Sequence, residues 1–244
     1  YPQYESLVCN ILDKNLKIRI SSSILQKVFP LEFPTFHVSL ANNFNPKYLD
    51  EGNWFISRKL DGVRCLCMIE QDGSISLLSR NQKPFHTLSL LQQELTNSQM
   101  VRTLIEKHGG GVLDGEIIDN YEKDSFKKIM EQISRKNYTL ENFEYRIFDY
   151  IPIEDFQRGK SNLIFRERLQ IMETLFSPES FCSIYCKLLP QSPYSKENLN
   201  EWVEKLQTNQ WEGLMLRKDT VWQGKRTNDL LKYKIMHDEE FKVL

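Results

Sequence analysis

Three short apolar runs separated by Asp-Gly pairs constrain the fold of this chain more than any other feature of its sequence. The runs cover residues 54–56, 65–69 and 75–78, and an Asp-Gly pair lies in each gap, at positions 61–62 and 72–73. An Asp-Gly pair favours the tight turn of a β-hairpin, and a connection this short joins antiparallel strands. We therefore predict an antiparallel meander in which the three runs form consecutive, paired strands.

Longer periodic segments follow the meander and indicate a mixed fold. The expected helices cover residues 88–107, 126–133, 163–176 and 199–206, and the expected strands cover 112–118, 145–151, 214–216 and 230–235. The fold class is therefore α+β, with mainly antiparallel sheets and flanking helices. Four prolines and short apolar runs make residues 1–50 a lead-in of short elements, which leaves residues 51–244 as one domain.

The composition excludes several classes of protein. Of the 244 residues, 40% are hydrophobic and 27% charged, so the chain is neither disordered nor collagen-like. With 32 basic and 33 acidic residues the net charge is −1, so a nucleic-acid site would need a local concentration of cations. No apolar run reaches the ~20 residues of a membrane span. Five cysteines without a CxxC pair favour a reduced, intracellular compartment, and the start at Tyr1 indicates a piece of a longer protein.

The segment of residues 59–64, Lys-Leu-Asp-Gly-Val-Arg, is the most informative string in the chain. It places Lys59 at the end of an expected strand and Arg64 at the start of the next. A lysine in such a place can be buried and held. Taken alone, the string also fits an ordinary hairpin whose lysine happens to precede the turn.

Five further motifs follow this lysine in order. They are Ser79-Arg80-Asn81, Asp114-Gly115-Glu116-Ile117, Phe148-Asp149-Tyr150, Glu212-Gly213-Leu214-Met215-Leu216-Arg217 and Leu231-Lys232-Tyr233-Lys234. Together with residues 59–64 they resemble motifs I, Ia, III, IIIa, IV and V of the covalent nucleotidyltransferases, the superfamily of ATP-dependent DNA ligases, RNA ligases and mRNA capping enzymes. The resemblance runs from residue 55 to the end and implies the ATP-grasp-like nucleotidyltransferase domain of DNA ligases.

The resemblance makes Lys59 the nucleophile that forms lysyl-AMP from ATP. A lysine attacks phosphorus only as the neutral amine, so burial and neighbouring cations must lower its pKa from about 10.4. Lys232 and Lys234 occupy alternate positions of one expected strand, point the same way and would supply those cations. In the family the same pair grips the α-phosphate, although a Lys-x-Lys strand alone also fits a solvated face.

Two glutamates beside glycines are candidate ligands for Mg²⁺. Glu116 and Glu212 each lie on an expected strand with apolar neighbours, and carboxylate oxygens suit this hard cation next to a triphosphate. By resemblance Glu212 would bind the metal and Glu116 the ribose or the metal, with Asp61 as a further candidate. The alternative is that these acids only accept hydrogen bonds from backbone N–H groups in turns.

The remaining motif residues complete the nucleotide site that the resemblance implies. Phe148 would stack on adenine, Arg64 would reach the ribose and Arg80 a phosphate. Read alone, Phe148 also fits a core position and either arginine a surface position. The expected ATP-binding set is Ser57, Arg58, Lys59, Leu60, Arg64, Arg80, Glu116, Phe148, Glu212, Lys232 and Lys234.

Details of the motifs favour the DNA ligases, and among them the compact viral and phage enzymes. RNA ligases more often carry Asn at the position of Arg64, and capping enzymes usually begin motif IV with Asp where this chain has Glu212. One departure is Ser57, since many DNA ligases have a glutamate there that accepts a hydrogen bond from adenine. The serine hydroxyl can accept that bond, so ATP stays the expected nucleotide.

The implied activity is the sealing of a nick in duplex DNA by an intracellular, monomeric enzyme. AMP would pass from Lys59 to the 5′-phosphate, and the 3′-hydroxyl would then displace it. RNA ligation and a non-catalytic binding module are the alternatives. The OB-fold that follows in DNA ligases is absent from this chain, so we expect weak self-adenylylation.

The expected nucleic-acid contacts are Arg58, Arg80, Lys83, Lys218, Lys225 and Arg226, and the loop 218–228 would either cover a nick or be merely solvated.

Overall fold

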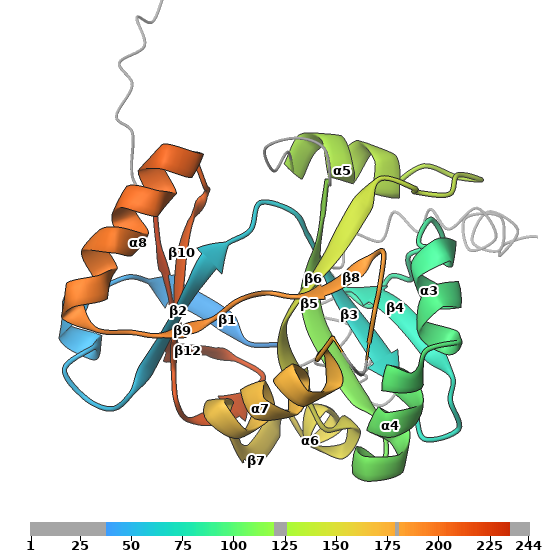
Figure 1. The fold of residues 1–244 in the computed structure, drawn as a ribbon, viewed down its shortest axis with the longest axis horizontal. Helices are drawn as coiled ribbons and strands as arrows, with labels where there is room; N and C mark the ends of the chain where they lie inside the picture. The colour runs from blue at the N-terminus through green and yellow to red at the C-terminus, as the bar shows by residue number, and fades with distance from the viewer. Residues whose placement is uncertain (1–37, 120–125, 179–180, 235–244) are drawn as a thin grey trace, which may run out of the picture. The chain divides into compact units, whose positions relative to one another are not determined.

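The strands and helices of the protein form two facing five-stranded sheets with helices on their outer sides (Figure 1). The computed structural model describes residues 38–119, 126–178 and 181–234, which all lie in one compact unit of the chain, Phe36–Leu244. This arrangement is the α+β fold with mainly antiparallel sheets that the sequence predicts.

The first sheet, called sheet A, has the strand order β1-β12-β10-β2-β9. Its strands are β1 (Leu40–Asn43), β2 (Trp54–Lys59), β9 (Ser192–Pro193), β10 (Gly213–Lys218) and β12 (Arg226–Tyr233). Neighbouring strands of sheet A pair antiparallel, except that β1 runs parallel to β12. Because β1 pairs with β12, residues 38–50, which also contain the short helix η2 (Pro46–Tyr48), contribute to this sheet. The division of the chain at residue 50 stays a prediction.

The second sheet, called sheet B, has the order β4-β3-β5-β6-β8. Its strands are β3 (Val63–Ile69), β4 (Ile75–Ser79), β5 (Gly111–Asp119), β6 (Phe143–Ile151) and β8 (Cys186–Leu188). A separate two-stranded ribbon pairs β7 (Lys160–Ile164) with β11 (Val221–Gln223). Sheet B is antiparallel except for its β6–β8 edge.

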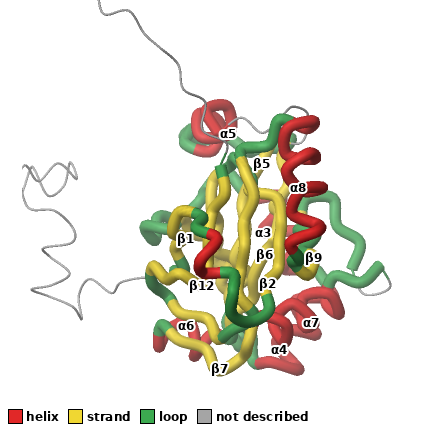
Figure 2. Tube along the Cα trace, turned by 90° about the vertical axis from the view of Figure 1, so that its left-hand side faces the viewer, coloured by secondary structure: helices red, strands yellow, loops and turns green. Residues whose placement is uncertain are grey.

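Helices cover the outer faces of both sheets. They are α3 (Ser89–Thr96), α4 (Gln99–His108), α5 (Phe126–Ile133), α6 (Ile153–Arg158), α7 (Phe165–Leu175) and α8 (Lys196–Asn209). Figure 2 shows α8 along the strands of sheet A and α5 at the end of the molecule opposite α4 and α7. Leu206 of α8 packs with Ile56 and Leu214 of sheet A, whereas α3, α4 and α7 share the large apolar core of sheet B. None of the helices in the described ranges is long and apolar enough to span a membrane.

The expected three-stranded meander is wrong at its first turn. The second turn is a hairpin, since β3 pairs with β4 across Gly73, but β2 pairs with β9 and β10 and has no register with β3. Residues 60–62 instead carry the chain from sheet A into sheet B. The buried side chain of Leu60 packs with Ile118 and Leu189, which holds this crossing inside the protein. The ordinary hairpin that residues 59–64 also fitted is therefore excluded.

Several expected boundaries shift because a side chain caps a helix or a short strand intervenes. The segment 88–107 forms two helices, since the hydroxyl of Ser98 accepts a hydrogen bond from the N–H of Val101 and starts α4. The segment 163–176 becomes helical only at Phe165, after β7. The short elements α6, β7, β8, β9 and β11 were not expected from the sequence, because they are too short to show a period.

The four cysteines that lie in the described ranges are free thiols, and three of them are buried. The fifth cysteine of the chain, Cys9, lies outside the described residues. Burial raises the pKa of the Cys67 thiol to about 12, which keeps it protonated and poorly reactive. The three buried thiols, Cys65, Cys67 and Cys186, therefore act as small apolar side chains of sheet B.

We predict that Gly62→Ala lowers the free energy of unfolding by about 1–3 kcal/mol, because overpacking costs this much. A Cβ at position 62 would overlap the carbonyl oxygen of Ile117 and the side chain of Ile118. Gly73→Ala is the comparison, since Gly73 has a φ of +86° but open space around it, and only the backbone cost of about 1 kcal/mol is expected. Urea unfolding of both variants measures the difference, and an equal loss in the two would contradict the close approach at Gly62.

Candidate active site

A cavity of about 280 Å³ lies between the two sheets, where the chain crosses from one to the other. Strand alternation turns Ser57 and Lys59 of β2 toward it, because Trp54 and Ile56 face α8 on the other side of sheet A. The residues that line the cavity are Ser39, Leu40, Ala41, Ser57, Arg58, Lys59, Leu60, Arg64, Arg80, Glu116, Phe148, Leu189, Met215, Arg217, Arg226 and Lys232. Most of the residues expected to bind ATP thus come together in one place.

Lys59 is held by a carboxylate that it shares with a second lysine. Its ammonium group donates to Glu212 and, at 3.4 Å, to the carbonyl oxygen of Leu60. The other carboxylate oxygen of Glu212 lies 2.5 Å from Nζ of Lys234. Burial alone would raise the pKa of Glu212, but the hydrogen bonds from Lys234 and Lys59 hold it below its ordinary value. Glu212 is therefore a carboxylate that positions two cations.

Glu116 is the second carboxylate at this end of the cavity. Its Oε1 accepts a hydrogen bond of 3.1 Å from the backbone N–H of Gly62, so the crossing segment holds it in place. Burial raises the pKa of Glu116 to about 7, against the opposing effects of Lys59, the Gly62 N–H and Arg64. A carboxyl group with this pKa exchanges its proton near neutral pH.

The described residues contain no group of three or more His, Cys, Asp or Glu side chains arranged to hold a metal by themselves. Mg²⁺ next to a triphosphate needs only one or two protein carboxylates, because phosphate oxygens and waters complete its shell. The negative charge of Glu212 raises the pKa of Glu116, and both carboxylates lie beside Lys59. This pair of glutamates therefore fits a Mg²⁺ ion. Asp61 lies elsewhere: its Oδ2 is 3.5 Å from the N–H of Phe126 at the start of α5.

The aromatic ring of Phe148 forms part of the cavity wall. It is partly exposed, whereas its neighbours Ile147 and Asp149 in β6 are buried. The guanidinium groups of Arg64 and Arg217 lie 5.8 and 5.9 Å from the ring centre. Phe148 is therefore not an ordinary core aromatic, because its ring presents a face to the cavity.

Arg64 is fixed at the back of the cavity by three hydrogen bonds. Its Nε and Nη2 donate to the buried carboxylate of Asp114 at 2.8 and 2.5 Å, and its Nη1 donates to the carbonyl oxygen of Ser39 at 2.8 Å. A bidentate pair of this kind fixes the plane of the guanidinium group. Arg64 is thus a positioned group and not the surface residue that it could have been from sequence alone.

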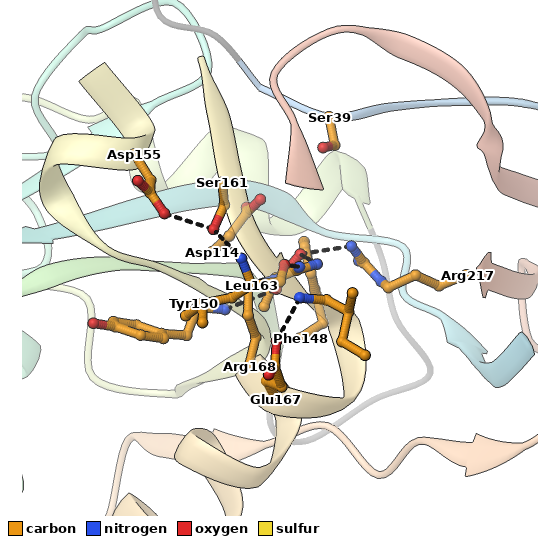
Figure 3. Close-up of polar contacts among 12 residues, drawn as sticks. Ser39, Asp114, Phe148, Tyr150, Asp155, Ser161, Leu163, Glu167, Arg168 and Arg217 are labelled. Carbon is orange, nitrogen blue, oxygen red and sulfur yellow. Dashed lines mark hydrogen bonds and ion pairs between the residues drawn. The ribbon is translucent and has the colours of Figure 1, made fainter. Parts of the chain in front are cut away.

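Beneath Phe148, Asp149 joins two arginines in a buried ion cluster. Asp149 Oδ1 accepts from Arg168 Nε at 2.8 Å, and Oδ2 accepts from Arg217 Nη1 at 2.6 Å. Figure 3 shows Arg217 reaching toward this region from one side, with Arg168 on the other. Burial would raise the pKa of Asp149, but the two arginines hold it below its ordinary value. The cluster connects sheet B to sheet A, because Arg217 belongs to β10.

The structure places the remaining expected residues in different regions. Arg58 lines the cavity, but its guanidinium lies 5.1 Å from the ring of Trp211, toward α8. Arg226 also lines the cavity and donates to the carbonyl oxygen of Ala41. Lys83 and Lys218 line other hollows, and the carbonyl oxygen of Lys225 accepts from Leu40 N at 3.2 Å.

Residues 218–228 do not form the loop that the sequence predicts, while their role at a nick stays a prediction. Its middle forms β11, which pairs with β7, and its end belongs to β12. The Trp222 side chain is 2% exposed and packs with Phe156. The apolar ring is buried because β11 lies against α6 and β7, which the sequence did not predict.

Sequence reasoning missed the contribution of the segment before β2 and of Arg217. Ser39, Leu40 and Ala41 line the cavity, and the carbonyl oxygens of Ser39 and Ala41 fix Arg64 and Arg226. No sequence signal marks such backbone acceptors. Arg217 ends the motif that begins at Glu212, so its position in that string could have identified it.

The family of ATP dependent DNA ligase domains matches residues 38–234. The chain belongs to the ATP-dependent DNA ligase family. Its match covers both sheets and every motif described above. The family membership that the motifs predicted is confirmed, and with it an ATP-dependent, ligase-type nucleotidyltransferase domain.

Solved structures of ligases share the fold of this ligase domain. Pmar-Lig_PreS3 aligns with a TM-score of 0.70 and 26% identity over 93% of this chain and 54% of that chain, so the present chain spans about half of its length. The ligase of bacteriophage T7 in complex with ATP aligns with a TM-score of 0.64 and 18% identity over 81% of this chain and 68% of that chain. The Chlorella virus DNA ligase-adenylate aligns with a TM-score of 0.58 and 20% identity over 82% of this chain and 67% of that chain. No curated protein matches the chain.

We predict that Asp149→Asn lowers the free energy of unfolding by about 3–5 kcal/mol at pH 7, because it leaves buried arginine charge without a counter-ion. Arg168 and Asp149 are 2% and 1% exposed. Since the folded pKa of Asp149 is depressed, its contribution is present above pH ~4 and is lost as the pH falls further. Urea unfolding at pH 7 and pH 3 measures both effects.

The control is Glu131→Gln, which breaks an exposed pair with Arg135 and should change the free energy of unfolding by less than about 0.5 kcal/mol. An equally small change in Asp149→Asn would contradict the role of the ion cluster.

We predict that Glu116→Gln stabilises the free protein more at pH 8 than at pH 5. The pKa of Glu116 is raised to about 7, so the folded state binds this proton more tightly than the unfolded state. The wild-type protein therefore loses stability as the pH rises from about 4.5 through 7, and the variant does not. Thermal unfolding without Mg²⁺ across this range tests the sign, and a variant whose stability follows the wild-type pH curve would refute it.

Proposed function

We propose that this domain is the adenylation domain of an ATP-dependent DNA ligase and that Lys59 is its nucleophile. The observation that carries the proposal is the position of Lys59. Its amine lies at a cavity lined by Arg80, Lys232 and the ring of Phe148, and Glu212 holds it there. A lysine, cations for phosphates and an aromatic face for a base are the groups that adenylyl transfer from ATP requires.

In the first step the lysine attacks ATP. Lys59 loses its proton, its nitrogen forms a bond to the α-phosphorus, and the bond from that phosphorus to the pyrophosphate oxygen breaks. The product is lysyl-AMP, a phosphoramidate, and free pyrophosphate. Lys234 and Lys232 stabilise the charge that develops on the α-phosphate, and the second of these lines the cavity directly.

Two transfers on nicked DNA complete the cycle. An oxygen of the 5′-phosphate attacks the phosphorus of lysyl-AMP, the phosphorus–nitrogen bond breaks, and Lys59 regains its amine. The 3′-hydroxyl then attacks the phosphorus of the 5′-phosphate, its proton leaves, and AMP departs with the bridging oxygen. The nick is sealed, and the chain returns to its starting state.

The remaining residues bind and orient the nucleotide. Phe148 offers its ring to adenine, and the bidentate pair with Asp114 fixes Arg64 for the ribose. Ser57 can accept a hydrogen bond from the base in place of a glutamate. Glu116 and Glu212 would hold Mg²⁺, which neutralises charge on the leaving pyrophosphate when it is bound.

We expect Lys59→Ala to abolish covalent labelling by ATP. Intact-mass spectrometry after incubation with ATP and Mg²⁺ should show a gain of one AMP on the wild-type chain, and none on the variant. Lys205→Ala, which removes an exposed lysine of α8, should label as the wild type does. Label that persists in Lys59→Ala would place the nucleophile elsewhere.

The label should then disappear when nicked duplex DNA is added, with AMP transferred to the 5′-phosphate. Nicked RNA and nicked DNA offered at equal concentration separate the two ligase activities, since only the preferred substrate should discharge the label quickly. Absence of any label under conditions in which the wild type binds ATP would favour a non-catalytic nucleotide-binding module.

A further inference from the structure

A short segment at the start of the described chain forms one wall of the nucleotide cavity. We call residues 38–44 the strap. It contains β1, which pairs with β12, and three of its residues, Ser39, Leu40 and Ala41, line the cavity. None of the sequence motifs described above includes these positions. The strap therefore adds a part to the site that the motifs leave out.

The first two residues of the strap are fastened to β11. The side chain of Val38 is 7% exposed and belongs to the same apolar cluster as Trp222. The next residue makes a polar contact with the next position of β11, because the hydroxyl of Ser39 donates to the carbonyl oxygen of Gln223 at 2.6 Å. Two neighbouring contacts of different kinds hold the backbone at residue 39, which leaves it little freedom to turn.

The carbonyl oxygen of the same serine holds Arg64. It accepts a hydrogen bond of 2.8 Å from Nη1, whereas Nε and Nη2 of Arg64 donate to the carboxylate of Asp114. A bidentate pair fixes the plane of a guanidinium group, but the group can still pivot within that plane about the carboxylate. The third bond, made at the other nitrogen, restricts this pivot. Ser39 therefore helps to set the direction in which Arg64 points.

Arg64 keeps donors for a ligand after these bonds are made. A guanidinium group carries more N–H donors than the three used here, and the part of the chain that the structure describes offers Arg64 no further hydrogen-bond acceptor. Its side chain is 20% exposed and lines the cavity, with the ring centre of Phe148 at 5.8 Å. A sugar hydroxyl attached to a base on that ring would lie within reach of these donors.

We propose that Ser39 is a positioning residue of the nucleotide site. Its hydroxyl anchors the strap to β11, and its carbonyl oxygen sets the direction in which Arg64 presents its remaining N–H groups to the ribose of ATP. The inference rests on the proposed function for the identity of the ligand. The hydroxyl itself does not donate to ATP, because its proton is donated to Gln223.

The test is the affinity for ATP of Ser39→Ala, measured by calorimetric titration in EDTA, where no metal supports the reaction. Binding should weaken roughly fivefold, which is the typical effect of losing one hydrogen bond. Ser39→Thr keeps the hydroxyl and should restore the wild-type affinity. Ser39→Cys replaces Ser39→Ala if the alanine variant does not fold, because a thiol of similar shape is only a weak donor.

A matched control separates this effect from a general loss of stability. Ser98→Ala on α4 also removes a serine hydroxyl that donates to a backbone carbonyl oxygen, that of Leu95 at 2.9 Å, but this residue does not line the cavity. It should lower the temperature of unfolding and leave the affinity for ATP unchanged.

A second background tests whether Ser39 acts through Arg64. In Arg64→Lys the planar group that Asp114 and Ser39 hold together is gone, since a lysine does not reproduce a bidentate arginine. Adding Ser39→Ala to this variant should weaken ATP binding by less than about twofold. A purely structural role for the serine would weaken binding equally in both backgrounds.

Each outcome decides the proposal. Wild-type affinity in Ser39→Ala, a threonine variant that does not restore binding, or equal losses in the two backgrounds overturns it. AMP labelling of the wild-type chain in Mg²⁺, measured in parallel, separates this result from the proposed function. Labelling together with unchanged affinity in Ser39→Ala refutes the role of Ser39 alone. ATP binding that depends on Ser39 in a chain without label supports that role and refutes the adenylation chemistry, and a wild-type chain that binds no ATP overturns both.

Discussion

The arrangement of this domain depends on one buried carboxylate. Asp149 belongs to sheet B, and the two arginines that it binds come from α7 and from β10 of sheet A. Charges removed from water are tolerated only when they are paired with good geometry, so the three side chains have little freedom to separate. The spacing of the two sheets, and with it the width of the cavity between them, follows from this pairing. Phe148 precedes Asp149 in the chain, so the cluster also fixes the aromatic wall of the cavity.

Around this fixed frame, the carboxylates keep cations concentrated in a protein with almost no net charge. Glu212 holds Lys59 and Lys234, and Asp114 holds Arg64. Each carboxylate reduces the mutual repulsion of the basic groups while no phosphate is present. In the proposed reaction a triphosphate brings negative charge of its own, so the cations would turn to it without moving far. A site arranged in advance in this way would reorganise little during the reaction, which is the condition under which electrostatic stabilisation is most effective.

The sequence predicted which residues gather at the cavity better than it predicted how the strands that carry them are connected. Lys59, Glu116, Phe148 and Lys232 could be found because each lies in a short string whose residue types and order are characteristic. Local turn chemistry misled the expectation for residues 60–62, since an Asp-Gly pair favours a hairpin whether or not a second sheet is available to receive the next strand. Local patterns do not identify partners that are distant in the sequence. The sequence therefore did not predict the backbone acceptors at Ser39 and Ala41, the parallel pairing of β1 or the burial of Trp222.

The order of strands along the chain has a consequence for how the protein is made. All of sheet B lies between β2 and β9, so its segments leave the ribosome together, while sheet A needs strands from both ends of the described chain. Strand β2, which carries Lys59, is synthesised early, but its partner β10 pairs with it across a large sequence separation, with Lys59 opposite Gly213. Contacts of this kind form late and slowly, because a long loop must close first. Lys59 therefore meets Glu212 only once nearly the whole domain has been synthesised, and a truncated nascent chain lacks the ion pair at the centre of the proposed adenylation site.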